Sequence, residues 1–177
     1  MESNSASTYQ YQHSLHRKTR NALVTTALAL MGEKGLSQTN MIEIADRARV
    51  SRASLYNHFR DKNEVFLAVV EMEVERIVQL ALRERDVAAR LAIVSKEISG
   101  HKALSMSVAK DPATIASLLA RHEGDLWAKI YQGLASVVAS DSAGTALAFR
   151  WLIGQIFIPL TPEHSDSQSK RIAGAIR

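Results

Sequence analysis

The sequence contains no cysteine, and its 177 residues include only eight glycines and three prolines. Without cysteine, the chain can form no disulfide, thiolate metal site or cysteine nucleophile. The glycines are dispersed, and neither a phosphate-binding glycine loop nor a G-x-S-x-G or HExxH motif is present. His101, His122 and His164 lack the close spacing of metal ligands on one helix. We therefore expect no enzymatic activity, no bound metal and no cofactor.

Long apolar runs are also missing. The longest covers residues 151–160 and is interrupted by Gly154 and Pro159, whereas a helix needs about 20 apolar residues to span a bilayer. The first residues, MESNSASTYQYQHS, are polar throughout and lack the apolar stretch of a secretory signal. These absences predict a cytoplasmic protein that does not enter a membrane.

Acidic residues are scarce in the first third of the chain. Residues 1–62 carry nine Lys or Arg against five Asp or Glu, and residues 63–177 carry thirteen of each, so the formal net charge of +4 lies entirely in the first part. A basic segment joined to a neutral one is typical of a DNA-binding module attached to a sensing or pairing module. Taken alone, the charge also permits a basic surface that binds nothing.

Apolar residues at helical spacing are abundant, and no alternating strand pattern appears. We therefore predict an all-α fold. Residues 1–13 lack this periodicity, which predicts a flexible arm. We expect Gly35 to end the first helix, and Pro159 and Pro162 to end the last strong one. The expected helices cover residues 14–34, two short stretches within 40–59, then 63–83, 86–99, 103–110, 112–139, 143–158 and 167–176.

Residues 40–59, NMIEIADRARVSRASLYNHF, are typical of a helix-turn-helix, in which a tight turn joins two short helices. Asn40 and Ser51 stand where the two helices begin, so each side chain can accept a hydrogen bond from a free backbone N–H. Ala45 is small enough for the helices to cross closely. The residues expected to form their shared core are Ile42, Ile44, Ala45, Ala48, Val50, Leu55 and Phe59.

The second of these helices carries a group of hydrogen-bond donors. Side chains of this kind bind phosphate oxygens and base edges in DNA. We therefore interpret this helix as one that reads DNA. The donors are Arg52, Ser54, Tyr56, Asn57 and His58.

Linked pieces of sequence around the motif make it more specific: G-L followed by S-Q-T-N, then I-A-D-R-A, V-S-R-A-S-L-Y-N-H-F and D-K-N-E-V-F. With them, residues 17–70 resemble the TetR family of transcriptional regulators. The resemblance implies an N-terminal three-helix DNA-binding domain over residues 14–62. It also implies a C-terminal helical ligand-binding and dimerisation domain over residues 63–177.

The function that this resemblance implies is a transcriptional repressor. It would bind a palindromic operator in double-stranded DNA as a homodimer and leave it when a small apolar or amphipathic ligand binds the second domain. The alternative is a DNA-bound structural or interaction protein that recruits a protein partner and has no small-molecule ligand. An enclosed cavity in the second domain would favour the repressor.

The resemblance also suggests contacts with the DNA backbone. It places Arg17, at the start of the first helix, beside the backbone, and Thr39 and Lys62 near phosphates. A solvated Arg17 and an ordinary surface Lys62 are the alternatives. Arg49 departs from the family, which usually has glycine in this turn. Either the turn is altered or Arg49 contacts a phosphate.

Base preference is expected to come from Arg52, Ala53 and Asn57, which lie early and late in the second helix. Affinity is expected to come largely from contacts of Lys and Arg with phosphates. The full set of expected DNA contacts is Arg17, Thr39, Asn40, Arg49, Ser51, Arg52, Ala53, Ser54, Tyr56, Asn57, His58 and Lys62.

The helix over residues 143–158 is apolar on two sides. Leu147 and Ile158 lie on one side, and Ala148 and Leu152 lie on another. A two-fold partner covers one such side when two recognition helices must meet two half-sites. We expect a homodimer through this helix and the long helix before it, the alternative being that both sides belong to one subunit's core.

Six polar-tipped or aromatic residues of the second domain are candidates for a ligand pocket. Pockets for small molecules are mostly apolar with a few polar groups, and each candidate can equally have a structural role. They are His101, His122, Trp127, Tyr131, Trp151 and Gln155.

Overall fold

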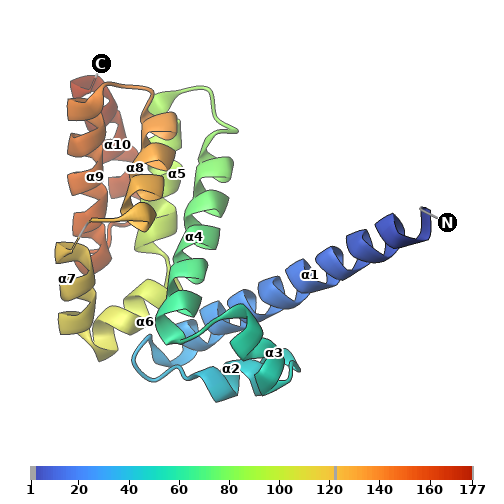
Figure 1. The fold of residues 1–177 in the computed structure, drawn as a ribbon. Helices are drawn as coiled ribbons and strands as arrows, with labels where there is room; N and C mark the ends of the chain where they lie inside the picture. The colour runs from blue at the N-terminus through green and yellow to red at the C-terminus, as the bar shows by residue number, and fades with distance from the viewer. Residues whose placement is uncertain (1–2, 122, 177) are drawn as a thin grey trace.

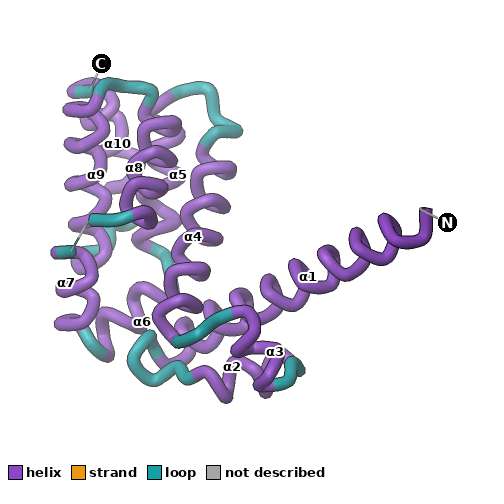
Figure 2. The backbone as a smooth tube through the Cα atoms, viewed as in Figure 1, coloured by secondary structure: helices purple, strands orange, loops and turns teal. Residues whose placement is uncertain are grey.

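The computed structural model describes residues 3–121 and 123–176, and within them the chain forms ten helices and no strand (Figures 1 and 2), which confirms the all-α class. The helices are α1 (Ser3–Lys34), α2 (Met41–Ala48), α3 (Arg52–His58), α4 (Lys62–Ala81), α5 (Val87–Ser99), α6 (Lys102–Lys110), α7 (Pro112–Ala120), α8 (Asp125–Val138), α9 (Ser142–Phe157) and α10 (Pro162–Ala175). An upright bundle containing α4, α5, α8, α9 and α10 stands over α1, and α2 and α3 lie below α1 (Figure 1). None of the described helices is long and apolar enough to cross a membrane.

α1 begins at Ser3, not near Ser14, so residues 3–13 extend this helix and do not form the expected flexible arm. The extension projects away from the rest of the molecule (Figure 1). No glycine or proline interrupts residues 3–31, and a helix that has formed adds further residues easily. The helix ends before Gly35, as expected, because Gly35 has a φ of 83° that suits a residue without Cβ.

A first hydrophobic core joins α1, α2, α3 and the start of α4. Ala45 is completely buried in it, in agreement with its expected role at a close crossing. Ile42 was expected there but is 44% exposed. Each residue turns a helix by about 100°, and the buried side of α2 follows Ile44 and Ala45. The buried members of this core on α1–α4 and the connecting loops are Leu23, Val24, Ala27, Leu30, Met31, Leu36, Ile44, Ala45, Leu55, Phe59, Val65, Ala68 and Val69.

α6 and α7 also pack against this first core, although the sequence assigned them to the second domain. Ala103 of α6 and Ile115 of α7 are buried in it. The backbone N–H of Leu36 donates to the hydroxyl of Ser107 at 3.0 Å, in a buried contact. The DNA-binding and C-terminal parts therefore share a core where α1 meets α6.

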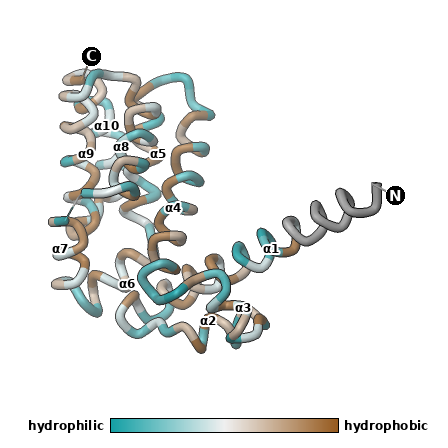
Figure 3. The backbone as a smooth tube through the Cα atoms, in the orientation of Figure 1, coloured by the Kyte–Doolittle hydropathy of each residue, from teal (hydrophilic) through white to brown (hydrophobic). Residues whose placement is uncertain are grey.

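A second core lies inside the bundle, and apolar residues recur along its helices (Figure 3). α8 approaches α4 closely at Gly133, where an added Cβ would lie 3.0 Å from Cγ2 of Val78. The larger buried residues of this core are Leu91, Val94, Leu134, Val137, Val138, Phe149, Leu152 and Ile176.

Two expected helix boundaries were wrong. The single helix expected over residues 112–139 is divided into α7 and α8, and Gly124 before α8 has a φ of 93°. α10 begins at Pro162, which was expected to follow a helix and not to start one. Proline suits the first helical position because no hydrogen bond needs its N–H there, and the Thr161 side chain caps the helix.

Candidate nucleic-acid interface

α2 begins at the side-chain cap that the sequence predicted. Asn40 has extended backbone, with φ of −130° and ψ of 158°, and its Oδ1 accepts from the backbone N–H of Glu43 at 2.9 Å. The side-chain amide of Asn40 donates to the Glu43 carboxylate at 3.3 Å, and Lys34 pairs with the same carboxylate. These contacts fix the start of α2 beside the end of α1.

The turn after α2 keeps a left-handed residue at Arg49, with φ of 56° and ψ of 39°. The backbone N–H of Val50 donates to the carbonyl of Ala45 at 3.0 Å, and that of Arg49 donates to the carbonyl of Asp46 at 3.2 Å. This pair of bonds is the Schellman arrangement that usually has glycine at the left-handed position. A non-glycine residue there costs about 1–2 kcal/mol. The turn is therefore not altered, and the Arg49 side chain is exposed beside it.

α3 has one buried side and one exposed side. The hydroxyl oxygen of Ser51 accepts from the backbone N–H of Ser54 at 3.1 Å, which confirms the predicted cap. Leu55 is completely buried and faces α1 and α2 with Phe59. The exposed side carries two pairs of residues, and the members of each pair are four positions apart and therefore neighbours on the helix surface. They are Arg52, Ala53, Tyr56 and Asn57.

The arginines near this face differ in their partners. Arg47 and Arg60 are held by carboxylates of the same domain, at 2.6 and 2.5 Å. Arg17, Arg49 and Arg52 are exposed and make no ion pair within the described part of the chain. Their guanidinium groups are therefore the cations best placed to meet an external anion.

Two expected phosphate contacts are turned inward. Thr39 is only 1% exposed, and its hydroxyl donates to the carbonyl of Gly35 at 2.9 Å. The expectation for Thr39 is therefore wrong, because its hydroxyl has a partner and no access to solvent. The Lys62 ammonium donates to the carbonyl oxygens of Leu36 and Ser37 at 3.3 and 3.2 Å. Lys62 thus joins the start of α4 to the loop before α2.

His58 also points away from the exposed face. Its ring lies against that of His16 in α1, with the ring centroids 4.0 Å apart, and its Nδ1 is buried without a hydrogen-bond partner among the described residues. Burial, then His16 and Arg20, lower the pKa of His58. The His58 side chain packs on α1, and a DNA contact by His58 stays a prediction. The sequence held no signal for this pair, since the two residues lie far apart along the chain.

Known proteins share this arrangement. Residues 23–69, which include α2, the turn and α3, match the family model for bacterial regulatory proteins of the tetR family. Residues 23–69 therefore form a TetR-family domain. This is a family of regulatory proteins and not of enzymes.

Curated relatives match part of the chain. The regulator AcrR of Shigella flexneri is 36% identical over 66 residues, which are 37% of this chain and 31% of AcrR. The transcriptional activator FasR of Mycolicibacterium smegmatis is 41% identical over 59 residues, which are 33% of this chain and 27% of FasR. The matched part of the chain thus spans less than a third of the length of either regulator.

The fold beyond this region resembles that of a solved TetR-family structure. AlkX from Dietzia sp. strain DQ12-45-1b is a repressor implicated in the biodegradation of n-alkanes. Its structure has a TM-score of 0.60 and 17% identity, and the comparison covers 89% of this chain and 94% of AlkX. The TetR-like fold therefore extends over both parts of the chain.

Three of the residues expected to bind a ligand lie in or against the core of the bundle. Trp127 and Tyr131 of α8 pack on Phe149 of α9, with ring centroids 5.9 and 4.3 Å apart. Gln155 of α9 is buried, and its Oε1 accepts from the hydroxyl of Ser95 at 2.7 Å. It also accepts from the hydroxyl of Ser99 at 3.0 Å. These side chains already have protein partners.

The other candidates lie apart from these. Nε1–H of Trp151 donates to Oε1 of Gln168 at 2.8 Å. His101 caps α6, because its Nδ1 accepts from the backbone N–H of Leu104, and its Nε2 lies 3.1 Å from the Glu73 carboxylate. His122 lies outside the described residues. Ligand binding by these candidates stays a prediction.

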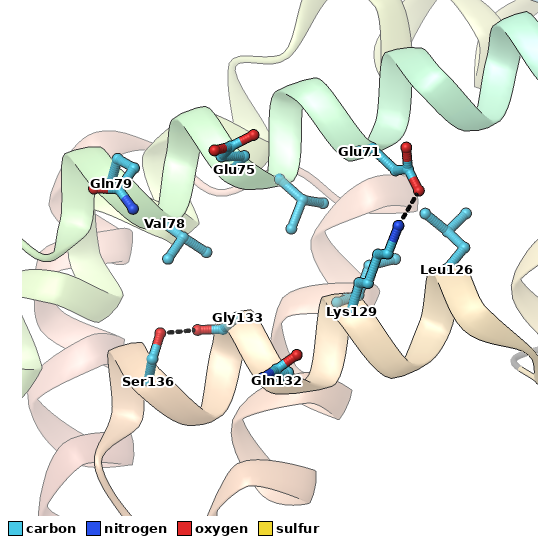
Figure 4. Close-up of a pocket in the computed structure, with 11 residues that line it drawn as sticks. Glu71, Glu75, Val78, Gln79, Leu126, Lys129, Gln132, Gly133 and Ser136 are labelled. Atoms are coloured by element: carbon cyan, nitrogen blue, oxygen red, sulfur yellow. Dashed lines mark hydrogen bonds and ion pairs between the residues drawn. The ribbon is translucent and has the colours of Figure 1, made fainter.

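The described residues instead line open grooves. One, of about 500 Å³, runs between α4 and α8 over Val74, Val78 and Ile130, and the ion pair of Lys129 with Glu71 bridges its two sides at 2.6 Å (Figure 4). Another, of about 610 Å³, lies where α1, α4 and α5 meet, beside His101. Within the described residues, no group of three or more His, Asp or Glu side chains is placed to hold a metal ion.

Proposed function

We propose that the protein is a sequence-specific transcriptional repressor that binds a palindromic operator as a homodimer in the cytoplasm and is released by a small ligand. The observation that carries this proposal is the exposed face of α3, presented by a helix-turn-helix whose two caps and left-handed turn are all in place. The TetR-family match of residues 23–69 supports it. The curated relatives include an activator, so the choice of repression and not activation is part of the proposal.

Arg52 and Asn57 are proposed to read base edges. The guanidinium of arginine suits the two acceptors of guanine, and the amide of asparagine suits adenine. Ala53 lies beside them and can meet a thymine methyl group. Tyr56 and Arg49 are proposed to contact phosphates, with Arg49 offering a cation at the turn. Affinity then falls steeply with salt, because each neutralised phosphate releases counterions.

The regulatory and dimerisation role is proposed for residues 63–177, with α9 as the main contact between subunits. Ala148 and Leu152 of α9 are buried within the subunit, whereas Leu147 is 42% exposed and Ile158, just past its end, is 76% exposed. A two-fold partner pairs such an apolar face with its own copy. The dimer places two α3 helices at half-sites about one turn of DNA apart.

The groove between α4 and α8 is the proposed ligand site. Val74, Val78 and Ile130 offer an apolar floor, and the carboxylate of Glu75 lies at its exposed edge (Figure 4). An amphipathic molecule with a positively charged group fits this combination. α4 carries the groove and also enters the first core, so a ligand that separates α4 from α8 acts on the DNA-binding part.

A second candidate function is a DNA-bound protein that recruits a protein partner and has no ligand. The observation that favours it is that Gln155, Trp151 and Tyr131 are all occupied by protein contacts. Failure of every amphipathic cation tested to release the DNA, together with capture of a protein partner that requires residues 63–177, would support this second candidate.

The proposal is tested by selecting bound duplexes from a random DNA library with the full chain. We expect a palindromic consensus, and sedimentation should give two subunits per duplex. The double variant Arg52→Ala/Asn57→Ala should lose the consensus. The matched variant Arg83→Ala/Arg85→Ala, with changes at exposed positions of the loop after α4, should keep it. Recovery of no preferred sequence at low or high salt contradicts the proposed function.

A further inference from the structure

The end of α3 is held on α1 by ring contacts. The rings of His58 and His16 lie 4.0 Å apart between centroids, at 44° to one another. Beside them, the Arg20 guanidinium lies 5.2 Å from the centre of the Phe59 ring. The last residue of the recognition helix and the residue after it are thus both seated on the same side of α1.

This contact suits a neutral imidazole. Nδ1 of His58 is buried without a partner among the described residues, and an imidazolium has a donor on both ring nitrogens. The charged or titratable groups that act on His58 are His16 and Arg20, both from α1, and neither is a carboxylate. Burial first, and then these two groups, lower the pKa of His58. A proton on His58 therefore meets positive neighbours and no acceptor.

We propose that His58 is a positioning residue: its neutral ring, resting on His16, holds α3 in the orientation that binds DNA, and protonation of the pair weakens DNA binding. In this role His58 touches no base. It acts through the placement of Arg52 and Asn57 on the exposed face of the same short helix. The inference rests on the proposed DNA binding by α3 and adds its dependence on pH.

The direction in which DNA affinity changes at low pH separates this role from a simple effect of added charge. A positive charge added near the interface strengthens binding to the phosphate backbone, so charge alone predicts higher affinity at low pH. Repulsion between a protonated His58 and Arg20 or His16 predicts lower affinity. Because the pKa of His58 is lowered in the folded chain, its contact is complete above the ordinary histidine value of about 6.5 and is lost as pH falls below that value.

A first experiment needs no DNA. Histidine side chains of the full chain are titrated by NMR. We expect the pKa of His58 to lie below the ordinary histidine value of about 6.5, and the substitution His16→Gln to raise the pKa of His58. A pKa of His58 at or above the ordinary value would overturn the proposal.

A second experiment measures the dissociation constant for the duplex recovered by selection, at constant ionic strength between about pH 5 and 8. We expect the wild-type chain to bind several-fold more weakly at the acid end, because a protonated His58 is repelled by His16 and Arg20. His58→Gln and His16→Gln should each flatten the profile, and His164→Gln should leave it unchanged. The second substitution keeps the test valid if His58→Gln disturbs folding.

The outcomes distinguish the proposed role of His58 from the proposed DNA binding on which it rests. If no duplex is recovered at any pH, the proposed DNA binding fails, and the positioning role fails with it. If a duplex is bound but its affinity rises as pH falls, or if both glutamine variants keep the wild-type profile, only the role of His58 is overturned.

Discussion

The backbone N–H of Leu36 donates to the hydroxyl of Ser107 at 3.0 Å, across the buried contact between the end of α1 and α6. It is a polar bond that joins the DNA-binding part to the C-terminal part. Ala103 of α6 and Ile115 of α7 are also buried in the first hydrophobic core. α6 is therefore joined directly to the end of α1 and to the loop before α2.

Substitution Ser107→Ala is expected to lower the free energy of unfolding by about 1–3 kcal/mol, because it leaves the buried N–H of Leu36 without an acceptor. Denaturant unfolding measures the change. The control is Ser105→Ala, since the hydroxyl of Ser105 is exposed and bonds only to the carbonyl of Lys102 in its own helix. A change of less than about 0.5 kcal/mol in both variants would show that the bond contributes nothing.

Substitution Arg49→Gly should raise the free energy of unfolding by about 1 kcal/mol, because glycine adopts the left-handed conformation without a Cβ clash. The same change should weaken DNA binding if the guanidinium contacts a phosphate. Ala139, with a φ of 50° after α8, provides the control: Ala139→Gly should stabilise the chain similarly and leave DNA affinity unchanged. Equal DNA affinity in both variants would show that Arg49 does not contact DNA.

Substitution Arg52→Ala is expected to change discrimination between operators by about 1–3 kcal/mol, because arginine reads a base edge through two bonds. Tyr56→Ala should weaken binding to all sequences about equally, since its hydroxyl is proposed to contact a phosphate. Competition binding with single-base operator variants measures both effects. Uniform weakening by Arg52→Ala would reassign that residue to a phosphate.

Substitution Gln155→Leu should destabilise the chain by about 1–3 kcal/mol, because the hydroxyls of Ser95 and Ser99 lose their shared acceptor inside the bundle. Thermal unfolding measures the loss. Gln132→Leu, at an exposed position of α8, should have a much smaller effect. An unchanged unfolding temperature for Gln155→Leu would mean that the serine hydroxyls find other partners.

The helix-turn-helix was predictable from the sequence because its determinants are local. Asn40 and Ser51 cap the helices that directly follow them, and Ala45 lies within the motif that it serves. The sequence also located Arg49 in the turn, although it left the geometry of that turn undecided.

The contacts that the sequence did not predict concern side chains whose partners are distant or whose surroundings are not local. Thr39 was expected at a phosphate, but it is enclosed by the packed loop and bonds to Gly35. His58 follows the donors of α3 in sequence, yet it packs on His16 of α1. For Gln155, a polar residue in an apolar helix suggested a ligand, and serines of α5 are its partners.

The sequence by itself determined the all-helical class, the capped helix-turn-helix and the basic character of residues 1–62, because spacing, capping and charge act over a few residues. Only the tertiary structure decided which donors of α3 face outward, because this depends on how α3 is seated on α1. It also decided that α6 shares a core with α1 and that His58 and His16 meet. Such contacts arise when helices pack, and no local pattern specifies which distant side chains packing will bring together.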